Sequence, residues 1–313
     1  MQKEKIIETI KKIVRFSPRI FKNEIKTRKF IEEKLRKNDI SYQLQFFKTT
    51  LPFYKKFSLC LDDIKIKCKP TCFKSGKIEE KALISSLHVR EEFKEANINF
   101  NPYCRSLSLP TFYYAPSLAI SRKDISKVLK AKNVIGKVKV SKKTYTTANL
   151  LVGNLKNPNS IYFTHYDCIE RGVIDNAVGV ALILNLILMK KDFLKQNLFV
   201  FSACEEISYD EVYWGYGFRV FEEEFKSLLN NAKKIIVIDS VGQTNANIIK
   251  GDEELVKEAF PIKNLKRFSK KISLIIGDIQ ELMKIYHSEL DNLSAIKLNV
   301  LYDTNTKLLK FLK

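Results

Sequence analysis

Apolar residues recur at helical spacing at the start of the chain. Four isoleucines in residues 2–16 repeat every three or four positions, and residues 23–37 continue this spacing with isoleucine, phenylalanine and leucine. Such spacing predicts two amphipathic helices. Residues 41–47 instead alternate polar and apolar side chains, which predicts a strand. The chain therefore begins as helix, helix and strand.

After residue 148, apolar runs of strand length alternate with segments of helical spacing. The sequence predicts strands at 161–164, 198–202, 235–238 and 272–276, and helices at 176–190, 219–230 and 304–312. The first of these helices is apolar around its whole girth, so we expect it to be buried. The alternation predicts an α/β fold, a three-layer sandwich with a central mixed, mostly parallel sheet covered by helices.

Residues 58–143 have a different pattern. Prolines, three of the six cysteines between 60 and 72, and short possible strands replace the helix–strand alternation. A short helix at 121–129 and a strand at 135–140 are the clearest elements in this segment. We therefore expect 1–57 and 144–313 to form one domain, with 58–143 as a smaller β-leaning insertion.

The composition fits a globular protein, with 45% hydrophobic and 29% charged residues. The net charge of +20 suggests a nucleic-acid partner, but the lysines are spread along the chain and form no basic tract with interleaved aromatics. We expect no nucleic-acid partner and no membrane span. The N-terminus resembles no signal peptide, which favours a cytoplasmic protein with reduced cysteines. The sequence does not indicate an oligomeric state.

Potential metal ligands follow the predicted strands. His165 and Asp167 come at the end of the strand 161–164, Glu205 and Glu206 follow the strand 198–202, and Asp239 follows 235–238. Ligands of open α/β sheets bind beyond the carboxyl ends of the strands, so the fold itself brings these residues to one edge. Unpaired charges at buried strand ends are costly, and a cation would compensate them. The pattern therefore predicts a metal centre.

The neighbours of these residues refine the prediction. His165 and Asp167 lie two apart, so in extended chain they share a face and the carboxylate can orient the imidazole. Glu205 and Glu206 are adjacent and cannot point the same way, which leaves one for metal and one for substrate and water. The sequence has three histidines, and His88 has no acidic company, so we interpret it as structural.

Taken in order, these motifs resemble the co-catalytic zinc exopeptidases of metallopeptidase family 28. That family includes leucyl aminopeptidases, glutamate carboxypeptidase II and glutaminyl cyclases. The motifs that carry the resemblance lie between residues 144 and 313, and they are His165-Tyr-Asp167, Asp175-Asn-Ala-Val-Gly179, Glu205-Glu206, Asp239 and His287-Ser-Glu-Leu-Asp291. The insertion takes the place of the protease-associated module of some relatives, and its end, residues 115–122, is similar to that module.

The resemblance implies two divalent metal ions per chain, for which zinc suits the mixed nitrogen and oxygen ligands best. It implies five ligands in two sets that share a bridging carboxylate, namely His165 and Asp239 for one metal, Glu206 and His287 for the other, and Asp175 between them. It also implies that Asp167 orients His165 and that Glu205 is the general base. Peptides are the substrates that this arrangement implies.

Three alternatives stay open beside an aminopeptidase. A carboxypeptidase would hold the substrate carboxylate with basic groups, for which Arg171 and Arg219 are candidates. A glutaminyl-cyclase-like aminoacyltransferase would use one zinc ion, although cyclases tend to lack the asparagine found here at position 176. A non-catalytic binding protein on the same fold would have lost ligands, whereas this sequence keeps all five. The side-chain preference and the physiological substrate are not predicted.

Overall fold

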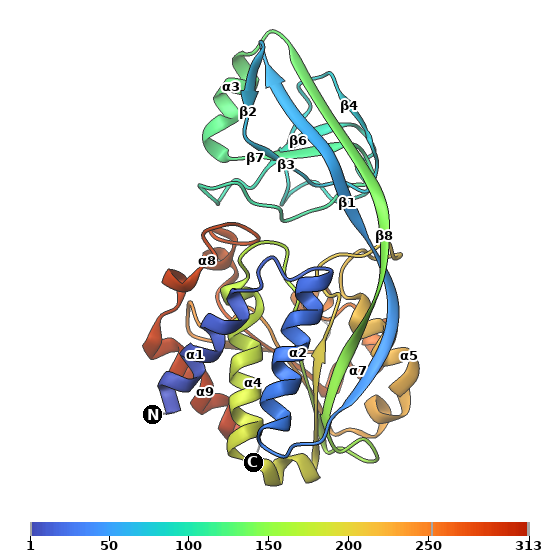
Figure 1. Ribbon diagram of the computed structural model, residues 1–313, viewed down its shortest axis with the longest axis vertical. Coiled ribbons are helices and arrows are strands. Elements are labelled where there is room, and N and C mark those ends of the chain that lie inside the picture. Colours follow the sequence, from blue (N-terminus) through green and yellow to red (C-terminus); the bar gives the residue numbers. More distant parts are fainter. Residues whose placement is uncertain (1, 252, 312–313) are drawn as a thin grey trace. The chain divides into compact units, whose positions relative to one another are not determined.

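The computed structural model describes residues 2–251 and 253–311 of the 313-residue chain, which forms two compact units (Figure 1). Unit 1 is built from Met1–Thr49, Tyr145–Leu282 and Asp291–Lys313. Unit 2 is built from Thr50–Thr144 and Met283–Leu290. The second unit therefore combines a long insertion with a short segment that comes much later in the sequence.

Unit 1 contains a mixed sheet whose strands follow the order β12-β13-β11-β9-β10-β8-β1. The strands are β1 (Gln43–Leu61), β8 (Val134–Gly153), β9 (Ser160–His165), β10 (Asn197–Ser202), β11 (Lys234–Ile238), β12 (Asn247–Lys250) and β13 (Ile272–Ile276). The four central strands β13, β11, β9 and β10 run parallel, whereas β12 and β8 pair antiparallel with their neighbours. The predicted mostly parallel, mixed sheet is confirmed.

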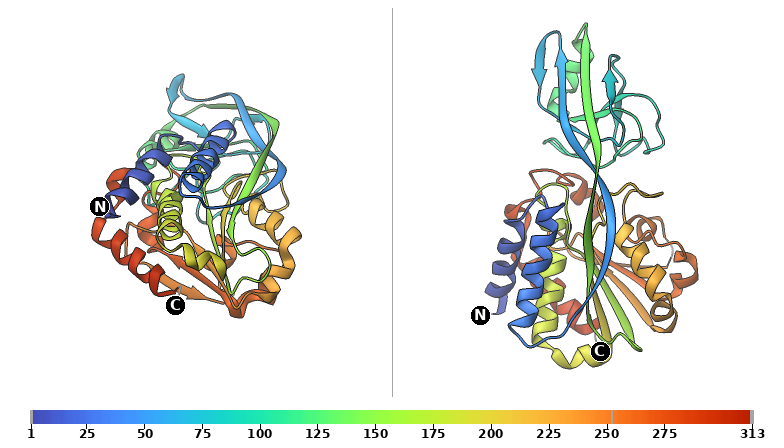
Figure 2. Two further views of the ribbon diagram at one scale, coloured as in Figure 1. Left: turned by 60° about the horizontal axis from the view of Figure 1, so that its bottom comes forward. Right: turned by 45° about the vertical axis from the view of Figure 1, so that its right-hand side comes forward.

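Helices cover both faces of this sheet, with α1, α2 and α4 on one face and α5 on the other (Figure 2, right). The helices of unit 1 are α1 (Gln2–Val14), α2 (Lys22–Arg36), α4 (Val178–Met189), α5 (Tyr216–Asn231), α6 (Glu254–Ala259), α7 (Leu265–Phe268), α8 (Ile279–Met283) and α9 (Leu298–Phe311). Short helical turns are η2 (Val173–Ala177), η3 (Lys191–Lys195), η4 (Ser269–Lys271) and η5 (Leu293–Ala295). The three-layer α/β arrangement is confirmed.

The core between the sheet and the second helix layer is aromatic. Phe163 of β9 lies 5.8 Å from Phe218 and 5.0 Å from Phe221 of α5, in edge-to-face geometry, and 4.9 Å from Phe260. All four rings are buried. Edge-to-face pairs add stabilisation to the burial itself. This packing holds β9, the strand that ends in His165, rigidly at the centre of the sheet.

Unit 2 has its own small sheet, in the order β3-β7-β6-β5, and its own apolar core. Its remaining elements are β2 (Ile64–Ile66), β3 (Cys68–Pro70), β4 (Gly76–Ile78), β5 (Leu83–Ser85), β6 (Asn97–Phe100), β7 (Ser117–Ile120), η1 (Arg122–Asp124) and α3 (Ile125–Lys130). Strands β2 and β4 pair with the distal parts of β1 and β8. The unit includes the whole segment 58–143, together with residues 50–57 and 144.

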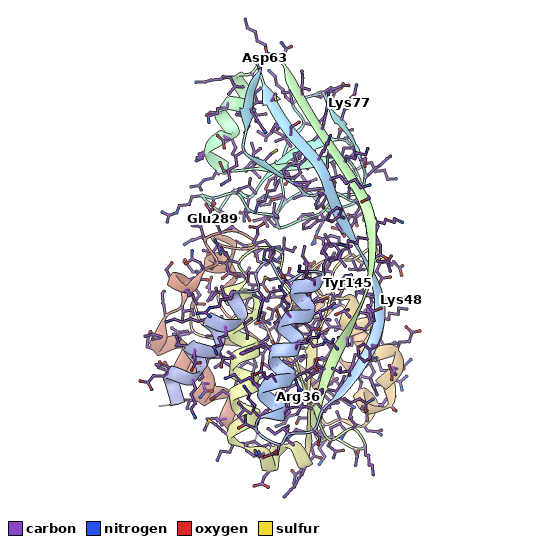
Figure 3. The ribbon with its side chains drawn as sticks, in the orientation of Figure 1. Arg36, Lys48, Asp63, Lys77, Tyr145 and Glu289 are labelled. Atoms are coloured by element: carbon purple, nitrogen blue, oxygen red, sulfur yellow. The ribbon has the colours of Figure 1, made fainter. Side chains whose placement is uncertain are left out.

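The late segment 283–290 is held within unit 2 by hydrogen bonds to residues 101–109. The Asn101 amide donates to the Met283 carbonyl at 2.9 Å, and the Ser108 hydroxyl donates to the Tyr286 carbonyl at 2.5 Å. Ser106 donates to Glu289, which is labelled in Figure 3. A histidine predicted as a metal ligand, His287, therefore belongs to this unit.

The four strands predicted after residue 148 are found within one residue of their expected ends. The strands expected at 41–47 and 135–140 are much longer, at 19 and 20 residues. The last helix begins at Leu298, and residue 312, its expected end, lies outside the described residues. None of the helices in the described part of the chain combines the length and the apolar character needed to cross a bilayer. All six cysteines are described and are free.

Candidate metal centre

Three neighbouring parallel strands carry the predicted ligands at their carboxyl ends. His165 is the last residue of β9, Glu205 and Glu206 lie in the turn after β10, and Asp239 directly follows β11. Strand β9 pairs in parallel with both of the others, so their ends meet at one edge. All of these residues except Asp239 are buried. The fold therefore brings residues 74 positions apart into contact, as the strand pattern predicts.

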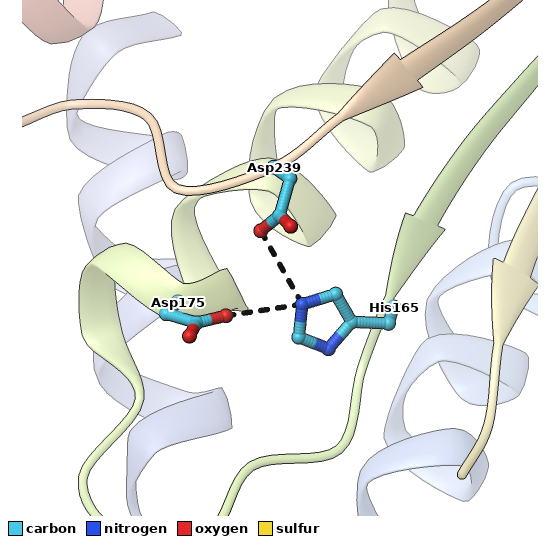
Figure 4. A group of neighbouring side chains, drawn as sticks. All are labelled: His165, Asp175 and Asp239. Atoms are coloured by element: carbon cyan, nitrogen blue, oxygen red, sulfur yellow. Dashed lines mark hydrogen bonds and ion pairs between the residues drawn. The ribbon is translucent and has the colours of Figure 1, made fainter. Parts of the chain in front are cut away.

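Two carboxylates, those of Asp175 and Asp239, approach the same nitrogen of the His165 ring (Figure 4). Its Nε2 is 3.1 Å from Oδ1 of Asp175 and 3.4 Å from Oδ1 of Asp239. Only 2% of the His165 side chain is exposed, so water screens these charges poorly. The three ligand atoms lie within 4.8 Å of one another, a spacing at which one cation can contact all of them.

The other nitrogen of His165 faces a second pair of carboxylates. Its Nδ1 is 3.4 Å from Oδ1 of Asp167 and 4.0 Å from Oε2 of Glu205. The second oxygen of Asp167 accepts the backbone N–H of Glu206 at 2.9 Å. Asp167 therefore connects the histidine to the turn that carries both glutamates.

Asp175 lies between the two sets of ligands. It approaches His165 and Asp239 as described, and one of its carboxylate oxygens also lies within 4.8 Å of a carboxylate oxygen of Glu206. A further set of ligand atoms, from His165, Glu205 and Glu206, also lies within 4.8 Å. This central position is the one that a bridging carboxylate requires.

The backbone around Asp175 is held from two sides. Asn176 donates its side-chain amide to the Thr164 hydroxyl at 3.1 Å and to the Ile238 carbonyl at 2.9 Å, which ties the turn to β9 and β11. Asp291 accepts the N–H of Asp175 at 3.2 Å and the N–H of the preceding residue at 2.7 Å. Two residues of the predicted motifs thus fix the position of the Asp175 carboxylate.

Gly179, the glycine of the Asp-Asn-x-x-Gly motif, lies where there is no room for a side chain. A Cβ on Gly179 would lie 2.2 Å from Oδ1 of Asn176 and 2.8 Å from the Thr164 hydroxyl. Any larger residue would push away the asparagine that ties the turn to the sheet. The spacing of this motif is therefore a consequence of packing in the first turn of α4.

The turn that carries Glu205 and Glu206 is held by backbone donors. Cys204 has a φ of 52°, a left-handed conformation that is uncommon for a residue with a Cβ. The N–H of Gly215 donates to the Glu205 carbonyl at 2.5 Å, and the N–H of Gly217 donates to the Cys204 carbonyl at 3.3 Å. Backbone N–H groups at the start of α5 therefore hold the turn that carries the two glutamates.

The crowding of these groups shifts their protonation. Burial by itself lowers the pKa of His165, but the charge of Glu205 and the contacts with Asp167 and Asp175 outweigh it and raise that pKa well above its usual range. Burial, and after it the charges of Glu206 and Asp239, raise the pKa of Glu205 well above its usual range, against the opposing effect of His165. The cluster holds more negative charge than one imidazolium can compensate.

These observations fit a centre for divalent cations. One imidazole and several carboxylates supply nitrogen and oxygen ligands of the kind that zinc accepts. The carboxylates are buried against one another, and a cation would remove the repulsion that raises the pKa of Glu205. The residues predicted from the sequence in unit 1, including Asp167, Asp175 and Asp239, all lie in this cluster.

His287 lies in unit 2, and its predicted role as a metal ligand stays a prediction. Its Nδ1 lies 3.0 Å from the carbonyl oxygen of Leu109, and its ring stacks on Tyr286 with centroids 3.8 Å apart. A proton on Nδ1 suits this carbonyl and makes Nε2 the nitrogen with the lone pair, as in many metal-binding histidines. His88, by contrast, is exposed and bonds to Ser85, in agreement with a structural role.

The two cysteines beside the ligands are poor nucleophiles. Burial raises the pKa of the Cys168 thiol to about 11 and that of Cys204 well above its usual range. Thiolates, not thiols, are the reactive form. A role as small buried residues in the packing therefore describes both cysteines better.

Arg219, one of the two basic candidates for holding a substrate carboxylate, is committed to the protein interior. Its five N–H groups donate to Asp210 twice, at 2.8 and 2.9 Å, and to the carbonyls of Trp214, Val212 and Pro261. Its side chain is 7% exposed. The remaining candidate, Arg171, is exposed.

Two buried ionic residues of the N-terminal segment were missed by the sequence analysis. Arg19 is fully buried and donates to the carbonyls of Tyr166 and Asp167, at 2.7 and 3.3 Å. Glu24 is fully buried and accepts the N–H of Cys204. A signal for Glu24 exists in the sequence, since it lies on the same helical stripe as Ile31 and Leu35.

Comparison with known proteins shows which solved structures share this fold. No protein-family model matches the sequence, and no curated protein matches it. Solved structures do match: a zinc aminopeptidase from Bacillus subtilis (16% identity, TM-score 0.71) covers 97% of this chain and 92% of its own. An aminopeptidase from Aneurinibacillus sp. strain AM-1 matches with 15% identity and a TM-score of 0.63, over 97% of this chain and 91% of that one.

A third similar structure is a glutaminyl cyclase from an Acidobacteriales bacterium, with 11% identity and a TM-score of 0.55, over 99% of this chain and 93% of that one. This chain has the fold of these enzymes. The resemblance predicted from the motifs is thereby confirmed at the level of fold. Both aminopeptidases and cyclases share this fold, so the activity must be argued from the residues of the centre.

Proposed function

We propose that the protein is a metal-dependent exopeptidase that removes single residues from the free N-terminus of peptides. The observation that carries this proposal is the cluster of His165, Asp175, Asp239, Glu205 and Glu206 near the carboxyl ends of three parallel strands, in which every residue except Asp239 is buried. Its members match, in order, the ligands and the base that the sequence resemblance implies. The fold shared with known zinc aminopeptidases supports the same class.

Two divalent ions suit the observed sets of ligand atoms, with Asp175 as the bridging ligand. His165 and Asp239 would hold one ion, and Glu206 would hold the other, together with His287 as predicted from the sequence. Such a pair of ions polarises the scissile carbonyl and lowers the pKa of a bound water from 15.7 towards about 7. We propose both the count of two ions per chain and their identity as zinc.

Glu205 is the residue that we assign to proton transfer. In this position it approaches Nδ1 of His165 and is not needed as a ligand, so its carboxylate is available to water. Its place beside the ligands, 4.0 Å from Nδ1 of His165, suits a group that would accept a proton from the attacking water and pass it to the leaving amine. Asp167 acts on His165, whose ring it orients through the contact at Nδ1.

Release from the N-terminus is favoured over release from the C-terminus by the charges near the centre. The carboxylates of Glu205 and Asp239 create a negative potential that attracts a substrate ammonium group. Arg219 has all five donors engaged within the protein, so it offers none to a substrate carboxylate. A carboxypeptidase would therefore depend on Arg171 alone of the two candidates.

Aromatic residues of the loop after Glu206 could either line a substrate pocket or pack under the loop. Tyr213 is buried and lies edge-on against Trp214, whose indole N–H donates to the Glu258 carbonyl at 2.9 Å. Tyr216 packs edge-on against Phe47. These contacts favour a packing role for the three residues, so we assign them no part in substrate selection.

The cyclase alternative predicts one zinc ion and an acyl transfer instead of hydrolysis. Asn176, which cyclases tend to lack, is present and bonds to both β9 and β11, which favours the peptidase. A binding protein without catalysis is the third alternative. It is disfavoured because the full set of predicted unit 1 ligands lies together in one cluster.

A set of three peptides tests the proposal. The parent peptide has a free N-terminus and a free C-terminus, the second is N-acetylated, and the third is a C-terminal amide. The proposal expects the zinc-loaded protein to cleave the first and third peptides and to leave the acetylated one intact. Glu205→Gln serves as the inactive control. Cleavage that is lost on amidation but kept on acetylation would replace the aminopeptidase by a carboxypeptidase, and cyclisation of an N-terminal glutamine would favour the cyclase.

A further inference from the structure

Glu24 is a buried acid close to the metal centre that the chemistry described above does not use. It lies in the first turn of α2 and has no exposed surface. Glutamate is almost never fully buried unless it is paired or hydrogen-bonded, because burial without partners is unfavourable. The neighbouring helix residue Asn23, by contrast, is not buried and donates its side-chain amide to the carbonyl of Pro18, which precedes the helix. The position of Glu24 therefore needs a specific explanation.

The two carboxylate oxygens of Glu24 have different partners. Oε1 accepts the backbone N–H of Cys204 at 2.8 Å. Oε2 accepts the hydroxyl of Tyr145, which is labelled in Figure 3, at 2.5 Å. Tyr145 lies on β8, so this strand fixes the carboxylate while the other oxygen holds Cys204.

Cys204 is a position where the backbone needs external support. Its φ of 52° is in the left-handed region, which is unfavourable for residues other than glycine. Glu205 follows it directly, and Glu206 follows next. The backbone of this turn is held at three further points, since the Cys204 carbonyl accepts from Gly217, the Glu205 carbonyl accepts from Gly215, and the N–H of Glu206 donates to Asp167. Glu24 supplies the support at the start of the turn.

We propose that Glu24 is a positioning residue for the Glu205–Glu206 turn, through its hydrogen bond to the N–H of Cys204. As a statement about catalysis and metal binding, this rests on the proposed function of the two glutamates. Without Glu24, the buried N–H of Cys204 loses its acceptor, and the strained turn can relax towards an ordinary φ. Both glutamates would then shift together, one relative to the metal and the other relative to the water.

Three variants test this role. Glu24→Ala removes the acceptor, and Glu24→Gln keeps an oxygen that can accept the same N–H. Glu32→Gln is the matched control, because Glu32 lies on the same helix and also accepts a tyrosine hydroxyl, that of Tyr42 at 3.1 Å, but does not contact the turn. Tyr145→Phe is the substitute if Glu24→Ala does not fold, because it removes the hydroxyl that fixes Oε2 and so loosens the hold of the Glu24 carboxylate on the N–H of Cys204.

The first measurement is amide hydrogen exchange of the peptide that spans residues 202–208, in metal-free protein. We expect faster exchange in Glu24→Ala, and rates close to those of the parent protein in Glu24→Gln and in Glu32→Gln. The second is zinc affinity by competition with a chelator, which should fall about 10–100-fold in Glu24→Ala, as for other residues that orient ligands. If the parent protein is active, Glu24→Ala should lower kcat by a larger factor than it changes KM.

Unchanged exchange and unchanged zinc affinity in Glu24→Ala, or in Tyr145→Phe if the alanine variant does not fold, would overturn the proposal. So would a Glu24→Gln variant as defective as Glu24→Ala, because the charge and not the acceptor would then matter. If the parent protein cleaves no peptide, the proposed function fails, but the exchange measurement still decides whether Glu24 holds the turn. The two failures are therefore distinguishable.

Discussion

Asp167→Asn should weaken metal binding although it changes the shape of the side chain very little. In the parent protein, Oδ2 of Asp167 accepts the N–H of Glu206 at 2.9 Å, and Oδ1 lies 3.4 Å from Nδ1 of His165. Both tasks require an acceptor. Asparagine has one acceptor and one donor, so it can perform only one of them.

The histidine is expected to respond by changing tautomer. If the asparagine oxygen keeps the N–H of Glu206, its NH₂ group faces Nδ1 of His165. Nδ1 must then accept, and the ring proton moves to Nε2, the nitrogen that faces Asp175 and Asp239. A protonated Nε2 has no lone pair for a metal. The opposite orientation of the amide places its NH₂ against the N–H of Glu206, which is unfavourable as well.

The expected loss is about 10–100-fold in metal affinity, the range typical of residues that orient metal-binding histidines. This corresponds to about 1.4–2.7 kcal/mol of binding free energy. Zinc affinity measured by chelator competition, with circular dichroism to verify the fold, provides the assay. Asp192→Asn is the matched control, since the Asp192 side chain is 92% exposed and its carboxylate pairs with Lys195 on the surface at 3.0 Å. An Asp167→Asn protein that binds zinc as tightly as the control would refute the orienting role of Asp167.

Three further predictions concern other residues of the centre. Glu205→Gln should retain its metal and lose about 10²–10⁴-fold in kcat, as expected for a general base, whereas Glu206→Gln should lose metal first. Kinetics and metal analysis of both variants separate the two effects, and the opposite pattern would make Glu206 the base and Glu205 the ligand. Asp175→Ala should lose both ions and His287→Ala one, so full metal content in Asp175→Ala protein would contradict the bridge. Burial and the charge of Asp167 raise the pKa of Glu24 from 4.5 to about 8, so between these values the folded metal-free protein holds a proton that the unfolded chain has lost. Its free energy of unfolding should therefore fall as the pH rises through this window, by on the order of 5 kcal/mol from this group, and Glu24→Gln should show a shallower pH dependence in urea unfolding.

The sequence predicted the parts of the fold that depend on local pattern. The apolar runs that became β9, β10, β11 and β13 are short, flanked by loops and buried on both faces, so their ends could be recognised directly. His165 and Asp239 were found for the same reason, because parallel strands bring their carboxyl ends to one edge of a sheet.

The long strands could not be predicted in the same way. β1 continues through Pro52 and through a mixed run of lysines and aromatics, and it shows no strict alternation over its 19 residues. β8 continues through Thr144, Tyr145 and Thr146, most of whose side chains are exposed or half-buried. Pairing between the two strands provides the hydrogen bonds, and pairing between distant segments leaves little trace in the local pattern.

Arg19 and Glu24 illustrate the same limit at the centre. Charged residues on an N-terminal helical segment usually face water, and their partners lie about 150 to 180 positions away, at Tyr166 and Cys204. Their burial follows from the packing of this segment against the loops that follow β9 and β10. The stripe shared by Glu24 and Ile31 was the available signal, and the charge concealed it.

The central claim is that the buried cluster works as a two-metal hydrolytic centre. Its most direct test is the rate of hydrolysis of a peptide with a free N-terminus by metal-stripped protein, measured during titration with zinc. The account predicts no hydrolysis without metal and a rate that rises until about two ions are bound per chain. Full activity in the metal-stripped protein, or no hydrolysis of any free-N-terminal peptide by folded, zinc-saturated protein, would contradict it.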